Sequence, residues 1–207
     1  DWFNGNIWIS SDSGVTWVER SPGGRPRKWT SITSSTDGEF LAATDTCLEV
    51  WTSSDSGETW TQTPEVPLTA YPQFISASPD GTKLLLGEYG GSMWRSTNSG
   101  GSFTVVGARR RLRGLQAAGL QWVATAWNAA GTKVLAVTQN GNIWLSNDAG
   151  ATYTEDSSVG SPKEWRAITW DMDVPTTAVA AAANSNLWLS HDAGATWAEE
   201  LADDGMI

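Results

Sequence analysis

One eight-residue pattern, Ser-x-[Asp/Asn]-x-Gly-x-[Ser/Thr]-aromatic, occurs five times and constrains the fold of this chain more than any other feature. The copies begin 43, 43, 50 and 44 residues apart, at Ser10, Ser53, Ser96, Ser146 and Ser190. A nearly constant period of this size indicates one supersecondary unit that is stacked or arranged radially. The chain is therefore expected to be a repeat protein.

Each unit has the sequence pattern of four short strands. In the third unit the expected strands are 74–78, 83–88, 92–96 and 102–106, separated by turn residues such as those of Pro79-Asp-Gly-Thr82. Four strands joined by tight turns, repeated at this period, describe a blade of a β-propeller. We therefore predict an all-β fold, a β-propeller of four-stranded blades.

Aromatic residues keep the same position from unit to unit. A tryptophan lies two residues before each motif serine, at Trp8, Trp51, Trp94, Trp144 and Trp188. A tryptophan or a proline is expected to open the first strand of each full unit, at Trp29, Pro72, Trp122 and Trp165. Periodic aromatics at strand positions are typical of packing between blades. They are interpreted as core residues.

The eight-residue pattern itself, called the repeat turn below, has its own turn chemistry. Its Asp or Asn is expected to accept hydrogen bonds from backbone N–H groups two residues on, and its glycine is expected to supply a positive φ. The residues given this structural role are Asp12, Gly14, Trp17, Asp55, Gly57, Trp60, Asn98, Gly100, Phe103, Asp148, Gly150, Tyr153, Asp192, Gly194 and Trp197.

On these residues the pattern resembles the Asp-box, or bacterial neuraminidase (BNR) repeat. That repeat occurs in sialidases, in xyloglucan-degrading enzymes, in sortilin-type receptors and in the photosystem II assembly factor of plastids and cyanobacteria. The resemblance implies a propeller in which the box is structural and lies away from the active face, so no catalytic role is implied for it. It also favours an organellar lumen, for example that of a plastid, or another extracytoplasmic compartment.

The repeats form one expected domain, residues 1–207, with four full units and the outer half of a fifth. Propellers usually close their ring by completing one blade from both ends of the chain. The inner half of one blade must here come from residues outside this segment, from a partner, or not at all, and a longer chain is the preferred interpretation. A ring of five blades is the smallest closure, and six or seven are alternatives.

The charge of the chain argues against nucleic acid as a partner, because the net charge is -10 and phosphate binding needs a cationic surface. Most cations nevertheless fall in the linkers between units, which share one face of a propeller. They are Arg20, Arg25, Arg27 and Lys28 in one linker, Arg109, Arg110, Arg111 and Arg113 in a second, and Lys163 in a third. The second linker is about seven residues longer than the others, as repeat proteins often have at a binding face.

Arginines of this kind can bind carboxylates of a partner protein or of an acidic ligand, or can simply be solvated. We predict a non-catalytic interaction scaffold that binds a protein partner within a larger assembly. An accessory or assembly subunit of a photosynthetic complex is the more specific form of that prediction. Arg109, Arg110, Arg111, Arg113, Arg20, Arg25, Arg27 and Lys28 are the expected contacts.

The second function considered is carbohydrate handling, as a lectin-like or sialidase-like propeller, with Trp2, Trp127 and Trp170 as stacking residues if they are exposed. Hydrolysis would need paired carboxylates or a tyrosine nucleophile, and Asp171, Asp173 and Glu88, like the three tyrosines, have no distinguishing context. The one histidine, His191, lies in a repeat turn, and the one cysteine, Cys47, excludes an internal disulfide. No metal, no cofactor and no membrane span are expected.

Overall fold

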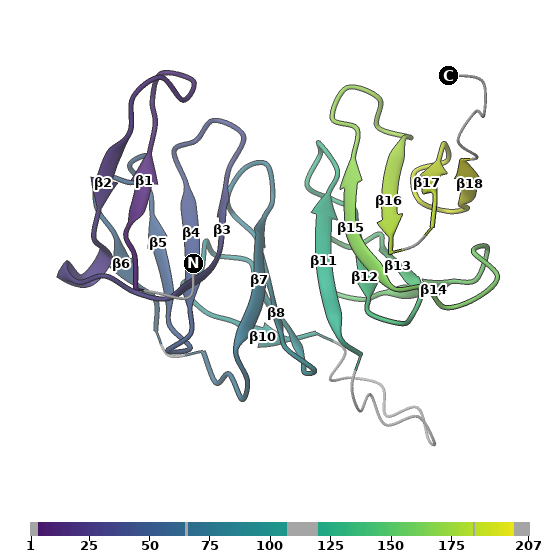
Figure 1. Ribbon diagram of the computed structural model, residues 1–207, viewed down its shortest axis with the longest axis horizontal. Coiled ribbons are helices and arrows are strands. Elements are labelled where there is room, and N and C mark those ends of the chain that lie inside the picture. The colour runs from purple at the N-terminus through teal and green to yellow at the C-terminus, as the bar shows by residue number, and fades with distance from the viewer. Residues whose placement is uncertain (1–3, 65, 107–119, 184, 201–207) are drawn as a thin grey trace. The chain divides into compact units, whose positions relative to one another are not determined.

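The computed structural model describes residues 4–64, 66–106, 120–183 and 185–200. Short antiparallel strands make up almost all of their regular structure, with one 3-10 turn, η1 (Pro22–Gly24) (Figure 1). Four sheets have four strands each and one sheet has two. The predicted all-β architecture of four full units and one half unit is thus confirmed.

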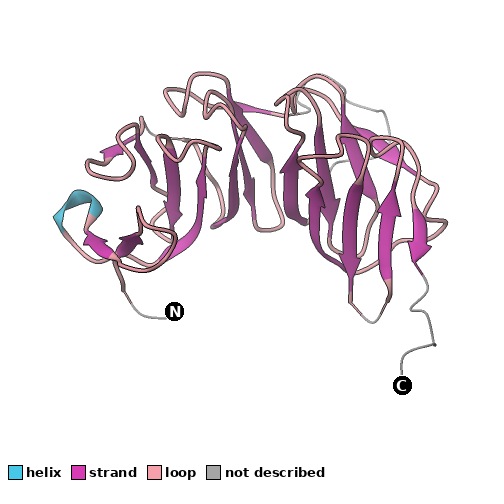
Figure 2. Ribbon diagram, turned by 90° about the horizontal axis from the view of Figure 1, so that it is seen from above, coloured by secondary structure: helices cyan, strands magenta, loops and turns pink. Residues whose placement is uncertain are grey.

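The strands of each sheet pair in chain order, as they do in a propeller blade. Figure 2 shows the strands as short arrows joined by loops and turns. The two-stranded sheet contains β1 (Ile7–Ile9) and β2 (Val18–Arg20). The four-stranded sheets are β3 (Trp29–Ser34), β4 (Leu41–Asp45), β5 (Val50–Ser53) and β6 (Thr61–Gln62); β7 (Pro72–Ala77), β8 (Leu84–Glu88), β9 (Met93–Ser96) and β10 (Thr104–Val105); β11 (Trp122–Trp127), β12 (Val134–Thr138), β13 (Ile143–Ser146) and β14 (Thr154–Asp156); and β15 (Trp165–Trp170), β16 (Ala178–Ala182), β17 (Leu187–Ser190) and β18 (Ala198–Glu200).

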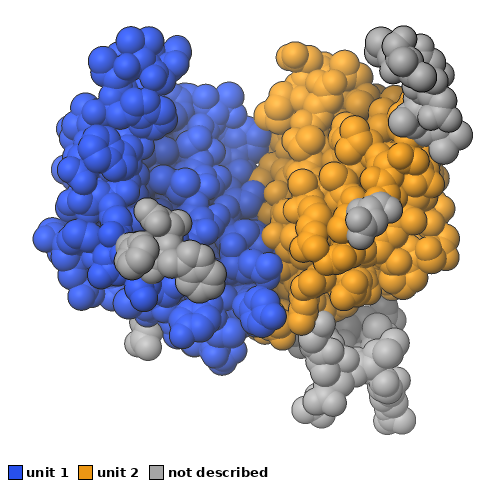
Figure 3. Space-filling model, in the orientation of Figure 1, with its two compact units in different colours: residues 1–89, 94–104 blue, residues 90–93, 105–207 orange. Residues whose placement is uncertain are grey.

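The chain divides into two compact units (Figure 3). Unit 1 comprises residues 1–89 and 94–104, with the sheets β1–β2 and β3–β6 and most of β7–β10. Unit 2 comprises residues 90–93 and 105–207, with the sheets β11–β14 and β15–β18.

The four-stranded sheets share an irregularity in strand pairing that the sequence does not predict. Trp29, Pro72, Trp122 and Trp165 each open the first strand of a sheet, as predicted. The pairing with the second strand shifts immediately after each of them, which marks a β-bulge at the same repeat position in all four sheets.

The core lies mainly on the second strand of each sheet. All five residues of β8 and all five of β12 are buried, and Ala42 and Ala43 of β4 are fully buried. Strands buried on both faces have apolar runs rather than alternating ones, as the sequence has at Leu84–Leu86. In unit 2 the core also includes Trp165 and Trp188, whose rings pack edge to face with their centroids 6.3 Å apart.

Neighbouring first strands lie side by side within each unit. In unit 1, Ser31 and Thr33 of β3 accept hydrogen bonds at their hydroxyls from the backbone N–H groups of Ile75 and Ala77 of β7, both at 3.1 Å. In unit 2, the indole N–H of Trp170 on β15 donates to the carbonyl of Ala126 on β11 at 3.0 Å. Each of these hydrogen bonds satisfies a polar group between two sheets, so the sheets are held in a fixed register.

The repeat turns are held by a network that recurs in each copy. In the last one, Ser190 Oγ donates to Asp192 Oδ1 at 2.8 Å and accepts from the N–H of Gly194 at 2.9 Å, while Asp192 accepts from the N–H and the hydroxyl of Thr196 at 2.8 and 2.6 Å. The Asp thus contacts the Thr four residues on, which corrects the expected partner two residues on. These hydrogen bonds stabilise the ionised carboxylate, so the pKa values of Asp12, Asp55 and Asp192 fall to about 2.

The predicted positive φ of the repeat-turn glycines is confirmed, at 82° to 88°. The residue before each of these glycines also has a positive φ, between 52° and 61°, although it is Ser or Ala in every copy. Two consecutive left-handed residues therefore form each turn, and only the second of them is a glycine.

Candidate interaction surface

Each four-stranded sheet has two chemically different ends. The repeat turn lies beside the turn between the first two strands, because Ser56 N–H donates to Glu39 O at 2.9 Å and Ala193 N–H donates to Thr176 O at 2.8 Å. The linker that enters a sheet lies beside the turn between its second and third strands, where Thr46 N–H donates to Lys28 O at 2.9 Å. We call these the repeat-turn end and the linker end of a sheet.

Arg27 lies inside the linker end and not on its surface. Its side chain is 6% exposed, its guanidinium is 2.8 Å from Asp45 Oδ2, and it also pairs with Glu49. It donates to Pro22 O at 3.1 Å and stacks over the Trp51 ring, with 4.3 Å between its Cζ and the ring centroid. This burial corrects the sequence-based assignment of Arg27 as a partner contact. A guanidinium that is buried and already paired with acids of its own chain is not accessible to the carboxylates of another protein.

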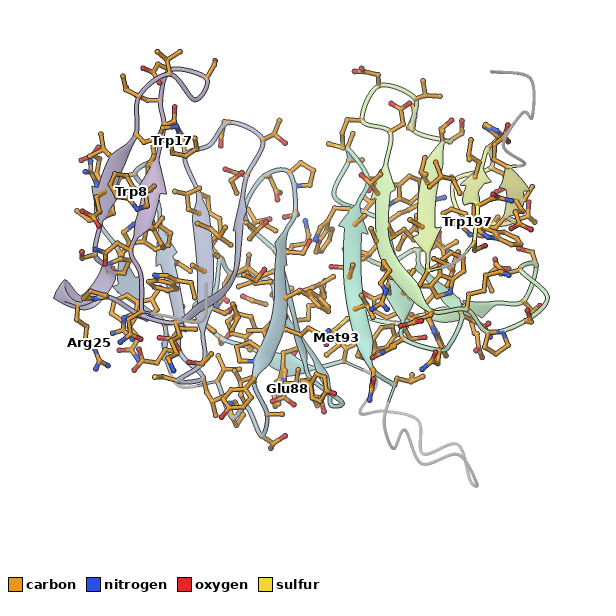
Figure 4. The ribbon with its side chains drawn as sticks, in the orientation of Figure 1. Trp8, Trp17, Arg25, Glu88, Met93 and Trp197 are labelled. Carbon is orange, nitrogen blue, oxygen red and sulfur yellow. The ribbon has the colours of Figure 1, made fainter. Side chains whose placement is uncertain are left out.

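The other three cations of the same linker lie at or near the surface. Arg20 is half-buried and donates to Glu58 Oε1 at 2.6 Å. Arg25 and Lys28 are exposed and form no ion pair among the described residues. Figure 4 shows Arg25 projecting from the linker between β2 and β3. We call these two exposed cations of the linker, Arg25 and Lys28, the linker surface.

Lys163 of unit 2 repeats the structural position of Arg27. Gly141 and Lys163 exchange two backbone hydrogen bonds of 3.1 and 2.9 Å, as Gly5 and Arg27 do at 2.8 and 2.9 Å. Lys163 Nζ lies 4.7 Å from the centroid of the Trp188 ring. The sequence signal for this bridge is the pentapeptide Asn-Gly-Asn-Ile-Trp, which begins at both Asn4 and Asn140 and which the search for cations alone missed.

Open pockets lie at the linker ends of two sheets. In unit 1 a cavity of about 360 Å³ is bordered by the turn Cys47–Val50 and by Val66 and Leu68 of the following linker. In unit 2 a cavity of about 710 Å³ is bordered by Pro162–Glu164, Ser185, Asn186 and Glu199. Concave surface thus accompanies the linkers, where the sequence predicted a binding face.

The arginine cluster of Arg109, Arg110, Arg111 and Arg113 lies outside the described residues. Its predicted role as a partner contact stays a prediction. All five repeat turns, by contrast, lie within the described residues. In two of them, Trp17 and Trp60 each donate from the indole N–H to the carbonyl of the turn glycine at 3.1 Å.

The tryptophans proposed as sugar platforms do not form one. Trp127 and Trp170 are 6% and 4% exposed, because both pack into the sheets of unit 2, and Trp2 lies outside the described residues. Trp8, which the repeat predicted as core, is instead 54% exposed, and Trp17 of the first repeat turn is 56% exposed. The condition of exposure is therefore not met for Trp127 and Trp170, and the prediction that Trp8 is a core residue is wrong.

The candidate catalytic acids are engaged locally. Asp171 accepts from the N–H groups of Asp173 and Val174 at 2.9 and 3.0 Å, as a turn residue does. Glu88 is 1% exposed and accepts from the N–H of Thr69 at 2.6 Å. Tyr153 is half-buried and packs against Trp122, with 5.8 Å between ring centroids. These contacts give each group a structural role in its own sheet.

The described residues contain neither a metal-binding cluster nor a helix that could span a membrane. No group of three or more His, Cys, Asp or Glu side chains among them could hold a metal ion. No helix within these residues has the length and apolar character needed to cross a membrane.

Serial four-stranded antiparallel sheets of this kind define the class of the protein, a β-propeller. The structure is similar to that of YCF48 bound to D1 peptide, with 17% sequence identity and a TM-score of 0.65 over 96% of this chain and 62% of that one. It is also similar to the GH74 enzyme of Niastella koreensis, with 18% identity and a TM-score of 0.67 over 88% of this chain and 27% of that one. A third similar structure is the Cps50 (Swd1) β-propeller domain of Myceliophteria thermophila, with 12% identity and a TM-score of 0.68 over 90% of this chain and 58% of that one.

At these identities the similarity establishes the fold alone. The chain spans less than two thirds of the length of each of these three proteins. No protein-family model and no curated protein matches the sequence.

Proposed function

We propose that this chain is a non-catalytic propeller scaffold that binds a protein partner through the linker surface of Arg25 and Lys28. The observation that carries the proposal is the contrast within one linker: Arg20 and Arg27 are paired with acids of the chain, while Arg25 and Lys28 are exposed and form no such pair among the described residues. Exposed cations held by ordered backbone are available for the carboxylates of another molecule.

Electrostatics supports a partner that carries acidic groups at its contact surface. The repeat-turn end carries Asp12 and Asp55, whose pKa values of about 2 keep them ionised at any physiological pH. An acidic partner is therefore repelled from that end of unit 1 and attracted to the linker surface. Such complementarity raises association rates and selects orientation more than it raises affinity.

An acidic peptide segment is the partner chemistry that we favour. The YCF48 structure, which has a similar fold, contains a D1 peptide, so a propeller of this architecture can hold a peptide. By extension, we propose a subunit of a larger assembly as the partner, and a photosynthetic complex as the more specific case. The sequence predicts Arg109, Arg110, Arg111 and Arg113 as further contacts with the carboxylates of a partner.

The test is quantitative affinity capture from native extract with matched variants. Arg25→Ser with Lys28→Ser removes two cations from the linker surface, and Lys83→Ser with Lys133→Ser removes two from positions next to the repeat-turn end. Both double variants have the same net charge, so only the position of the lost charge differs. A third variant changes Arg109, Arg110, Arg111 and Arg113 to serine.

The proposal predicts a protein that the original chain and the Lys83/Lys133 variant both capture and that the Arg25/Lys28 variant loses. Equal recovery by both double variants would contradict it. Loss only in the third variant would move the contact to the arginine cluster. The carbohydrate alternative predicts instead that no protein depends on these cations and that a glycan array identifies a ligand.

A further inference from the structure

The cavity at the linker end of unit 1 has an apolar floor beneath a more polar rim. Its volume is about 360 Å³, and the residues around it include Cys47, Leu48, Val50, Gln62, Val66 and Leu68. Val50 and Val66 are 2% and 6% exposed and belong to the core of the unit, while Cys47 and Gln62 are exposed. A cavity of this size lies in the range of ligand sites and can admit one side chain of another molecule.

One wall of the cavity holds a leucine in a backbone conformation that leucine disfavours. Leu48 is half-buried and has φ 66°, in the left-handed region. The corresponding turns of the next two sheets place Gly90 and Asn140 in that region, and both residue types adopt it more readily. A glycine at position 48 would form the same turn with less strain. The leucine is therefore best explained by the apolar surface that its side chain gives to the cavity.

The buried ion pair of unit 1 holds this strained turn in place. Asp45 Oδ1 accepts from the N–H of Cys47 at 2.9 Å, while Asp45 Oδ2 accepts from the buried guanidinium of Arg27 at 2.8 Å. On the linker side of the cavity, Leu68 N–H donates to Val66 O at 2.7 Å. Hydrogen-bonded backbone thus forms both walls, so the cavity is largely pre-formed, as ligand sites usually are.

The two exposed cations of the linker surface lie beside the elements that border the cavity. Lys28 O accepts from the N–H of Thr46, the residue before Cys47. Arg25 directly follows η1, which contacts β6, and Gln62 of β6 borders the cavity. A peptide whose apolar side chain enters the cavity can therefore place neighbouring carboxylates near these cations.

Two exposed tyrosines extend the linker end of unit 1 onto the next sheet. Tyr71 and Tyr89 are 63% and 61% exposed, more than any other aromatic among the described residues. Tyr89 N–H donates to Tyr71 O at 2.9 Å, and Tyr71 follows Leu68 of the cavity by three residues. Tyrosine is enriched at protein interfaces because it combines apolar area with a polar group. Exposed aromatic area next to the cavity favours a polypeptide as the occupant.

We infer that this cavity is the anchor site for one apolar side chain, of about leucine size, in an acidic peptide segment of the partner. The inference rests on the proposed function, which supplies the acidic partner, and it adds the residue type that the peptide needs between its acids. The acids contact Arg25 and Lys28, and the apolar side chain packs on Leu48, Val66 and Leu68. An acidic glycan has no such side chain and would bind through the cations alone.

The test uses Cys47, the one cysteine of the chain, which is exposed beside the cavity. Synthetic peptides that begin with Cys-Gly-Gly are exchanged onto the complete chain in a redox buffer of 2-mercaptoethanol, and mass spectrometry measures the equilibrium fraction of each mixed disulfide. One peptide ends in Asp-Glu-Leu-Glu-Asp, a second has serine in place of the leucine, and a third has lysine in place of each acid. The same exchange in denaturing urea gives the intrinsic preference of the thiol for each peptide.

The inference predicts an exchange constant about tenfold larger for the leucine peptide than for the serine peptide in the folded chain, and equal constants in urea. Equal constants in the folded chain would overturn it, and if the lysine peptide were then still the weakest, the linker surface would stand without the anchor site. A preference for leucine that is independent of the acids would support the anchor site and contradict the charge contact of the proposed function. The failures of the two proposals are therefore distinguishable.

Matched variants separate loss of the site from loss of the fold. Leu48→Gly and Ala193→Gly each replace a left-handed residue with glycine, so both relieve backbone strain, and urea titration verifies that both remain folded. Leu48→Gly should reduce the preference for the leucine peptide at least about threefold. Ala193→Gly, which lies in a repeat turn, should leave that preference unchanged. An undiminished preference in Leu48→Gly would exclude the cavity as the anchor site.

Discussion

At the scale of single residues, Arg27 forms a buried ion pair on which the stability of unit 1 is expected to depend. Asp45 is fully buried and the Arg27 guanidinium is 2.8 Å from it. Replacing Arg27 with methionine keeps much of the packing on Trp51 but leaves a buried carboxylate without its partner. We expect a loss of about 3–5 kcal/mol in the free energy of unfolding, measured by urea titration. Arg25→Met, at an exposed site, should change it by less than about 0.5 kcal/mol, and equal losses would contradict this account.

The carboxylates of the repeat turns predict how stability depends on acid. The pKa values of Asp12, Asp55 and Asp192 in the folded chain are about 2, below the ordinary 3.8. These three carboxylates therefore add stability that is complete above about pH 5 and is lost as pH falls toward 2. The urea midpoint should therefore drop between pH 4 and pH 2. Changing Asp12, Asp55 and Asp192 to asparagine should flatten that drop, and Asn98→Asp should steepen it. An unchanged slope in both variants would show that these carboxylates are not the source.

Single residues also show where sequence reasoning succeeds and where it does not. The motif spacing predicted the strand-opening residues and the turn glycines, because both depend on local geometry. The burial of Arg27 depends on Asp45, Glu49 and Trp51, which approach it only in the folded sheet, so its charge alone suggested a surface contact.

At the scale of elements, the repeat turns store backbone strain in a residue that is not glycine. Ala193 has φ 61° immediately before Gly194, and left-handed alanine is disfavoured by roughly 1–2 kcal/mol. Ala193→Gly should therefore raise the free energy of unfolding, by about 0.5–1 kcal/mol after the extra chain entropy is counted. The same change at Ala195, which does not have a positive φ, should give no gain. Equal effects in calorimetry would contradict this explanation.

The sequence predicts the positions of the strands closely. Apolar runs bounded by Pro-Asp-Gly or Asn-Gly predicted the strands, and β8 and β12 lie where those runs are. The β-bulge after Trp29, and the left-handed residue before each turn glycine, could not be predicted. Both arise from how one strand pairs with the next, and Ser and Ala carry no signature of a positive φ.

At the scale of the whole molecule, the cations of one linker have two roles: two of them stabilise the fold, and we propose that the other two bind a partner. Arg20 and Arg27 hold acids of their own unit, and Arg25 and Lys28 remain at the surface. The sequence predicted a β-propeller with cationic linkers from spacing and composition. It could not separate the structural from the exposed cations, because that division depends on tertiary contacts.

The most direct measurement is hydrogen exchange by mass spectrometry on the chain, alone and with the protein that affinity capture recovers. The account predicts slower exchange at residues 21–28, with residues 11–16 and 190–197 of the repeat turns unchanged. Protection of the repeat turns, with residues 21–28 exchanging as fast as before, would contradict binding through the linker surface.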